Sequence, residues 1–184
     1  MRLVLALAAV PAPFAAAPAA AQQQPVACVY YGMPKGDRPE LVKVVRAGIV
    51  ATNDGERVLV DNIKTSADAC RKRYGWGKKR QDAAMRYFAG RVLATDSTYH
   101  LKKFGFDYEK LKALVAALDA PTRQAYVAGN VTNEQSAATI AALKELGVDF
   151  AAVPAEERAM FGQKLSQGVL GLVVEQEGEA AYAD

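Results

Sequence analysis

The residues best placed for acid–base chemistry in this sequence are Asp96 and His100, the only histidine of the chain. They lie four positions apart, which on a helix is about one turn, so the carboxylate could orient the imidazole as a general base. A nucleophile would have to come from elsewhere. Ser97 and Thr98 leave a helix in other directions, and the chain has no Gly-x-Ser-x-Gly motif. A small hydrolase using His100 and Asp96 is therefore the alternative hypothesis, because such a histidine is more often a surface or helix-end residue.

Other catalytic or metal-binding patterns are weaker. Glu56, Glu109 and Glu134 each fall at an expected helix start, where acidic residues favour the helix dipole, so they do not indicate a glycosidase pair. With Gly55 as the sixth residue of a calcium loop, Val50 would occupy the first position, which requires a carboxylate. One histidine and two cysteines do not make a zinc site, and no glycine-rich phosphate loop occurs. We predict neither a metal nor a cofactor.

The strongest local anomaly is a basic segment around the single tryptophan. Six cations fall between Cys70 and Gln81 with no acidic residue among them. The segment supplies the candidate binding residues Arg71, Lys72, Arg73, Tyr74, Trp76, Lys78, Lys79 and Arg80. Three interpretations compete: an acidic tail carrying Glu175, Glu177 and Glu179 folds back on it, an anionic partner binds it, or the cations are solvated. We expect Trp76 itself to be a wedge between helices.

Residues 1–21 have the pattern of a secretory signal peptide. Arg2 precedes an apolar run over residues 3–10, and the small residues Ala19, Ala20 and Ala21 form a cleavage site before Gln22. An uncleaved membrane anchor is disfavoured because three prolines interrupt the segment. A lipoprotein signal is disfavoured because Cys28 lies too far from the apolar run. We therefore expect a periplasmic or secreted protein with no transmembrane segment in its mature chain.

The two cysteines of the chain, Cys28 and Cys70, are expected to form a disulfide in such an oxidising compartment. In the loop-closure model a bridge over this separation stabilises the fold by about 4 kcal/mol. It would also tie the N-terminal arm to the body. Free, reactive thiols are the alternative, but the Cys-x-x-Cys spacing typical of redox sites is absent.

Hydrophobic periodicity predicts an all-α fold: a compact orthogonal bundle of about six short amphipathic helices with an extended N-terminal arm. Asp107 and Asp119 are predicted helix caps, and Thr132 with Gln135 has the spacing of a capping box. The segment 41–63 is less clear. Its apolar residues at positions 41, 44, 45, 48, 49, 59 and 63 favour helix, but its valines and the turn signal at 53–55 also suit a small hairpin, giving an α+β alternative.

The expected organisation is a cleaved signal peptide over 1–21, an extended arm over 22–38, a single helical domain over 39–174 and an acidic tail over 175–184. Gly162, Gly168 and Gly171 in the last helix would permit close helix packing. The predicted core consists of Leu59, Ile63, Phe88, Val92, Leu111, Leu114, Leu118, Ile140, Leu143, Phe161 and Leu165.

Taken together, these features predict an exported, non-catalytic binding or envelope-associated module. Removing residues 1–21 takes away one charge, Arg2, and leaves a net charge of about +2, so no strong global field is expected. The candidate partner is an anionic component of the envelope, either a lipid head group or a polysaccharide, bound at the basic segment. Nucleic acid is excluded as a partner by compartment and net charge.

Overall fold

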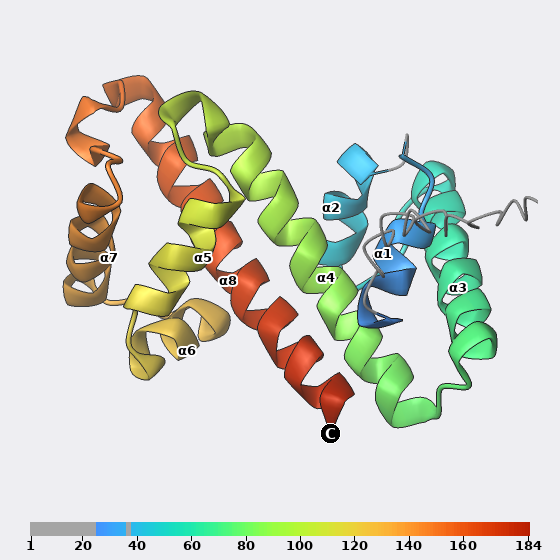
Figure 1. Cartoon of the computed structure of the whole chain (residues 1–184). Coiled ribbons are helices and arrows are strands. Elements are labelled where there is room, and N and C mark those ends of the chain that lie inside the picture. Colours follow the sequence, from blue (N-terminus) through green and yellow to red (C-terminus); the bar gives the residue numbers. More distant parts are fainter. Residues whose placement is uncertain (1–24, 36–37) are drawn as a thin grey trace, which may run out of the picture.

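The fold is organised around two long helices, α4 (Lys78–Leu101) and α8 (Arg158–Ala183), which lie side by side and run antiparallel (Figure 1). The structure is a computed structural model that describes residues 25–35 and 38–184. Over these residues the chain is all-α, as predicted, with eight α-helices and no strand. The signal peptide predicted over residues 1–21 lies outside the described residues.

Glycines bring the backbones of α4 and α8 together. A Cβ atom added at Gly90 would stand 2.5 Å from the carbonyl oxygen of Gly171, and one at Gly178 would stand 2.4 Å from the amide nitrogen of Tyr87. No side chain fits in such gaps, so these positions require glycine. Gly168 and Gly171 lie in this interface as expected, whereas Gly162 faces open space.

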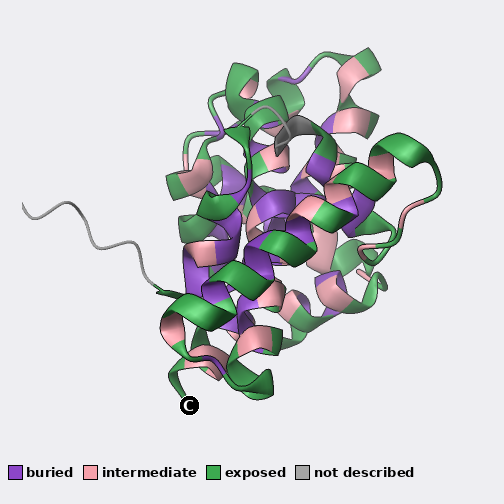
Figure 2. Cartoon of the chain, turned by 90° about the vertical axis from the view of Figure 1, so that its right-hand side faces the viewer, coloured by how far each residue is buried: buried purple, intermediate pink, exposed green. Residues whose placement is uncertain are grey.

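The shorter helices lie on the two sides of this central pair (Figure 1). On one side are α1 (Cys28–Gly32), α2 (Arg38–Arg46) and α3 (Asp54–Tyr74); on the other are α5 (Tyr108–Ala117), α6 (Ala120–Ala128) and α7 (Asn133–Glu145). Short 3-10 helices occupy Pro25–Ala27, Lys102–Phe104, Phe150–Ala152 and Ala155–Glu157. Buried residues gather along the inner faces of the helices, and exposed residues cover the outside (Figure 2). Two apolar clusters result, one on each side of the α4–α8 pair.

Local capping signals fix most helix ends. The side chains of Asp107 and Asp119 accept hydrogen bonds from the first turns of α5 and α6. Thr132 and Gln135 form the predicted capping box at the start of α7. Segment 41–63 contains no hairpin: it holds the end of α2 and the start of α3, joined by a turn over residues 47–53. Asn53 caps α3 by accepting a hydrogen bond from the Glu56 amide. The helical interpretation is confirmed on both sides of this turn.

Helix α2 ends earlier than the hydrophobic periodicity predicts. We expected Gly48 and Ile49 to continue this helix, but α2 ends at Arg46. Gly48 and Ile49 both have positive φ, at 78° and 62°, and the Ile49 amide donates to the Val44 carbonyl at 2.8 Å. This left-handed turn reverses the chain toward α3, and a β-branched residue rarely adopts it.

The N-terminal segment is tied to the body as an arm but is not extended where it is described. Cys28 is joined to Cys70 of α3 by the predicted disulfide. Residues 25–32 wind into a 3-10 turn and α1, and Val29 and Tyr30 are buried against the core. Burial of these side chains explains the helical conformation, since a helix also pairs the backbone groups that go inside with them.

Residues 175–183, expected to form an acidic tail, are instead the last turns of α8. The helix continues because its inner face is occupied: Glu175 is buried, Gly178 abuts α4, and Tyr182 contacts Trp76. The predicted core is also corrected at two positions: Ile140 lies on an exposed face of α7, and Leu59 is only partly buried against one apolar cluster. No helix within the described part of the chain is both long enough and apolar enough to cross a membrane.

Candidate functional site

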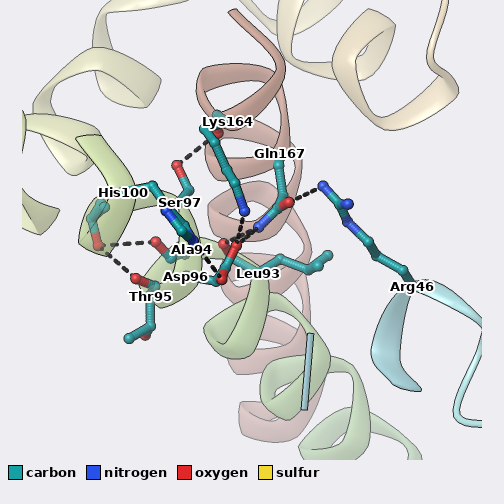
Figure 3. Close-up of polar contacts among 10 residues, drawn as sticks. Arg46, Leu93, Ala94, Thr95, Asp96, Ser97, His100, Lys164 and Gln167 are labelled. Carbon is teal, nitrogen blue, oxygen red and sulfur yellow. Dashed lines mark hydrogen bonds and ion pairs between the residues drawn. The ribbon is translucent and has the colours of Figure 1, made fainter. Parts of the chain in front are cut away.

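Asp96 of α4 stands at the centre of a polar cluster between α4, α8 and α2 (Figure 3). Its Oδ2 accepts hydrogen bonds from Lys164 Nζ at 2.6 Å and from Gln167 Nε2 at 2.7 Å, both from α8. Arg46 reaches across from α2 and donates to Gln167 Oε1. We call Asp96, Lys164, Gln167, Arg46 and His100 the Asp96 cluster. It joins three helices through side chains far apart in the sequence.

The charge on Asp96 is held in place by these donors. Burial by itself opposes ionisation, but the hydrogen bonds from Lys164 and Gln167 and the charge of Lys164 outweigh it and hold the pKa of Asp96 below its ordinary value. The other oxygen, Oδ1, lies 3.5 Å from His100 Nε2. The pair predicted from the sequence is therefore adjacent, although the carboxylate is already neutralised by Lys164.

Beside this cluster a groove runs along α4, with a volume of about 490 Å³. Its walls are formed by Val92, Thr95, Asp96, Tyr99 and His100 of α4, together with Tyr30 and Lys35 from the N-terminal segment. We call it the α4 groove. Tyr99 is 77% exposed, and its ring meets the imidazole of His100 edge to face at 5.4 Å between centroids. The volume falls in the range of small-molecule sites, and aromatic and aliphatic side chains alternate with polar ones.

The hydroxyls nearest His100 in sequence do not complete a catalytic triad. Ser97 is fully buried and donates its hydroxyl hydrogen bond to the Lys164 carbonyl at 2.7 Å. Thr98 donates to the Ala94 carbonyl of its own helix at 3.0 Å. Both hydroxyls stabilise backbone groups, so neither is free to attack a substrate. His100 therefore has no available nucleophile in Ser97 or Thr98.

The basic segment lies at the corner between α3 and α4, at the opposite end of α4 from the groove's His100. Its six cations, Arg71, Lys72, Arg73, Lys78, Lys79 and Arg80, are all exposed. We call them the basic corner. Gly75 ends α3 in a left-handed conformation, with φ of 62°, so the chain reverses there. The reversal brings the two cationic triplets to one corner of the molecule.

Trp76 is the predicted wedge between helices. It is 4% exposed, and its Nε1 donates to the Tyr182 hydroxyl of α8 at 2.7 Å. The Tyr74 ring stacks on it at 5.7 Å between centroids. Trp76 therefore points inward and holds the corner to α8, and the partly buried Tyr74 covers its ring.

The acidic residues near the end of α8 do not cover the basic corner in the way one interpretation required. Glu175 is buried beside Arg91 of α4, and Glu177 accepts a hydrogen bond from Gln124 of α6. Contact with the corner comes from Tyr182, whose ring lies 5.8 Å from the Arg80 guanidinium. Two corner cations are offset locally, Arg71 by Asp68 and Lys78 by Asp82.

A second buried polar group, unforeseen from the sequence, joins α4, α5 and α8. Glu175 accepts hydrogen bonds from Arg91 Nη1 at 2.9 Å and from the Tyr108 hydroxyl at 2.7 Å. Burial is the main cause that raises the pKa of Glu175, against the opposing hydrogen bonds. Burial and the Glu175 charge raise the pKa of Tyr87 to about 12. We call Arg91, Tyr108, Glu175 and Tyr87 the Glu175 cluster.

Sequence reasoning missed Lys164, Gln167, Arg46 and Arg91 as site residues. One signal was present, because Lys164, Gln167 and Glu175 interrupt the apolar face of the last helix. In the described part of the chain, no three His, Cys, Asp or Glu side chains stand close enough together to hold a metal ion. No protein-family model, curated protein or solved structure matches this chain. Function is therefore inferred from the chemistry of the described residues.

Proposed function

We propose that this chain is an exported, non-catalytic binding module that takes a small ligand in the α4 groove. The observation that carries the proposal is the groove itself, a hollow of about 490 Å³ that places Tyr30, Val92 and Tyr99 beside polar groups. Such concave, largely apolar surfaces with a few polar groups are the usual form of ligand sites. The Asp96 cluster supports the groove from behind by fixing α4 against α8 and α2.

The proposal is tested with a neutral fluorescent probe, phenylnaphthylamine, whose emission rises in apolar sites. Thr95 is exposed on α4 and lines the groove, so Thr95→Trp should fill it without disturbing the core. Arg86→Trp places the same bulk on an exposed position of the same helix away from the groove lining. We expect the wild type and Arg86→Trp to bind the probe and Thr95→Trp to lose binding at least about tenfold. Equal binding by all three proteins would reject the groove as the site.

Export rests on the N-terminal sequence pattern and is compatible with the formed disulfide. We propose that cleavage follows Ala21. The intact mass of the exported protein should then correspond to a chain starting at Gln22 with no free thiol. A mature protein that retains Met1 would contradict this part of the proposal.

A second candidate function is association with an anionic envelope component through the basic corner. It is favoured by six exposed cations at one corner, while Trp76 is buried and the partly buried Tyr74 stacks on it. Such binding would be electrostatic and screened by salt over about 10 Å at 0.1 M. It would not insert the tryptophan, so the emission of Trp76 should not shift on binding.

The envelope contact is tested by sedimentation with phosphatidylglycerol vesicles and, separately, by binding to a soluble acidic polysaccharide. Lys78, Lys79 and Arg80 are replaced together by Gln. The control replaces Lys43, Lys64 and Lys144, which are exposed cations on α2, α3 and α7, and so removes the same charge from scattered positions. We expect only the corner variant to lose binding. Equal retention by both variants would identify the corner as a solvated surface.

A hydrolase remains the alternative because Asp96 and His100 are adjacent at the groove, with Oδ1 and Nε2 3.5 Å apart. His100→Gln discriminates between the hypotheses. A binding module should keep its affinity for the neutral probe, whereas an enzyme should lose hydrolysis of a chromogenic ester. Ester hydrolysis by the wild type that disappears in His100→Gln would favour the enzyme.

A further inference from the structure

The α4 groove has two chemically different parts. Tyr99 presents an exposed aromatic ring, and Tyr30 of α1 and Val92, which are only 7% and 3% exposed, add small apolar areas to the lining. Lys35 and His100 add an ammonium group and an imidazole to the same lining. A ligand that used both parts would have an apolar body and a polar group able to accept hydrogen bonds.

The charge balance around the groove decides the sign of that polar group. The one carboxylate in the lining, Asp96, is already paired with Lys164, whose Nζ lies 2.6 Å from Oδ2. Behind it, Arg46 adds a further cation through Gln167. Among the described residues no carboxylate forms an ion pair with Lys35. Cations therefore exceed carboxylates, and the groove is complementary to an anion.

We propose that the α4 groove binds a small amphipathic anion: an aryl or similarly flat apolar body against Tyr30, Val92 and Tyr99, with its acidic group paired to Lys35. His100 offers a further hydrogen-bond donor along the same groove. This inference rests on the proposed function and adds the chemical class of the ligand. A cationic ligand would bring its charge toward Lys35 and would find Asp96 already neutralised, so it is disfavoured.

The size of the groove agrees with a ligand of two or three fused or linked rings. A volume of about 490 Å³ lies in the lower half of the range for small-molecule sites, roughly 300–1,000 Å³. Tyr99 is exposed at the rim, where its ring is available to cover one face of a flat ligand. A long polymer would leave most of its length outside this volume.

The test uses two probes that share one aromatic body and differ by an acidic group. Anilinonaphthalene sulfonate is an anion, and phenylnaphthylamine is its neutral counterpart without the sulfonate. A charge-assisted contact favours the anion by about tenfold or more. We expect the wild type to bind the sulfonate that much more tightly than the neutral probe, and Lys35→Gln to bind the two probes with nearly equal affinity.

Controls separate the ligand class from the groove. Lys144→Gln removes an exposed cation of α7 and should keep the preference of the wild type. Thr95→Trp should weaken both probes, and its circular dichroism should show that the fold is retained. Equal affinity for the two probes in the wild type would overturn the anionic class and leave the groove as a binding site. Failure of Thr95→Trp to weaken either probe would overturn the proposed function as well.

Discussion

Two carboxylates cross the interface between α4 and α8, and each meets a cation of the opposite helix. Glu175 of α8 pairs with Arg91 of α4, and Asp96 of α4 pairs with Lys164 of α8. In the first pair the carboxylate is enclosed: Glu175 is 5% exposed and is also bound by Tyr108, whereas the Arg91 side chain is 23% exposed. We call this the sealed pair, after its carboxylate. The second lies in the wall of a groove, with the Asp96 side chain 15% exposed.

Because the two carboxylates differ in burial, the same kind of ion pair has two different effects in this interface. Burial dominates at Glu175 and raises its pKa. At Arg91 burial lowers the pKa, but the charge of Glu175 and the nearby tyrosines together outweigh it and raise the pKa of the guanidinium. At Asp96 the hydrogen bonds and the charge of Lys164 together outweigh burial, and the pKa is lowered. A sealed pair ties helices together, whereas a half-open pair also shapes a surface that a ligand can reach.

The largest effect is expected from removing one partner of the sealed pair. Arg91→Met leaves Glu175 buried without its cation, and such losses typically cost about 3–5 kcal/mol in the free energy of unfolding. Arg86→Met, an exposed position of the same helix, is the control and should change stability by less than about 0.5 kcal/mol. Urea unfolding followed by circular dichroism measures both.

A double variant sharpens this result. Replacing Glu175 by Leu together with Arg91→Met removes the stranded charge, so the pair should recover a large part of the loss. Purely additive losses would mean that packing around each side chain, and not the unpaired carboxylate, causes the instability. The interpretation of a sealed charge pair would then be wrong.

Removing the cation of the half-open pair, Asp96 and Lys164, should destabilise the fold less. Lys164→Met removes the cation from Asp96, but Gln167 still donates to Oδ2, and Asp96 lies in the wall of the open groove. We expect a cost of about 1–3 kcal/mol, below that of Arg91→Met measured in the same urea titration. A cost equal to or above that of Arg91→Met would show that the two clusters do not differ in the way their exposure indicates.

The two clusters should also respond to pH in opposite directions. Because the folded-state pKa of Asp96 is lowered, its stabilisation is present above the ordinary aspartate pKa and is lost as pH falls through the folded pKa. Because the folded-state pKa of Glu175 is raised, its protonated form favours folding, and that contribution is lost as pH rises through the folded pKa.

Unfolding free energies between about pH 3 and about pH 6 test these signs. Asp96→Asn should reduce the loss of stability on acidification, relative to the wild type. Glu175→Gln should make stability rise more steeply with pH than in the wild type, since it removes a term that falls. The slopes are compared rather than the absolute values, because each substitution also alters hydrogen bonds. Slopes that change in the same direction for both variants would refute the assignment.

The sequence was sufficient for those parts of the fold that depend on near neighbours. Thr132 and Gln135 lie three positions apart, and their capping box forms as predicted. The disulfide was predictable because an oxidising compartment was expected and Cys28 and Cys70 were the only cysteines that could pair. Helices were therefore predictable, whereas the end of α8 was not. Its last turns are acidic in sequence but are held by contacts with Tyr87 and Trp76, which lie on or beside α4.

The candidate site was predictable only in its local half. Asp96 and His100 share one helix, so their spacing indicated adjacency. The residues that set the charge state of Asp96 come from α8 and α2, and Lys164 lies 68 positions away along the chain. These residues approach one another because glycines let α4 and α8 pack closely. Nothing in the sequence around Gly90 and Gly178 indicated that they lie at this interface. Non-local geometry, and not residue identity, was the missing information.

The smallest effect is expected at the open edge of the Asp96 cluster. The His100 side chain is 44% exposed, and its Nε2 lies 3.5 Å from Oδ1 of Asp96. The other carboxylate oxygen, Oδ2, already accepts hydrogen bonds from Lys164 and Gln167. His100→Gln should therefore change the free energy of unfolding by less than about 0.5 kcal/mol at about pH 7, as Lys144→Gln on α7 should. A loss above about 1 kcal/mol in parallel urea titrations would show that Asp96 depends on the imidazole as Glu175 depends on Arg91. The groove wall would then be as rigidly tied as the sealed pair, and the contrast between the two clusters would fail.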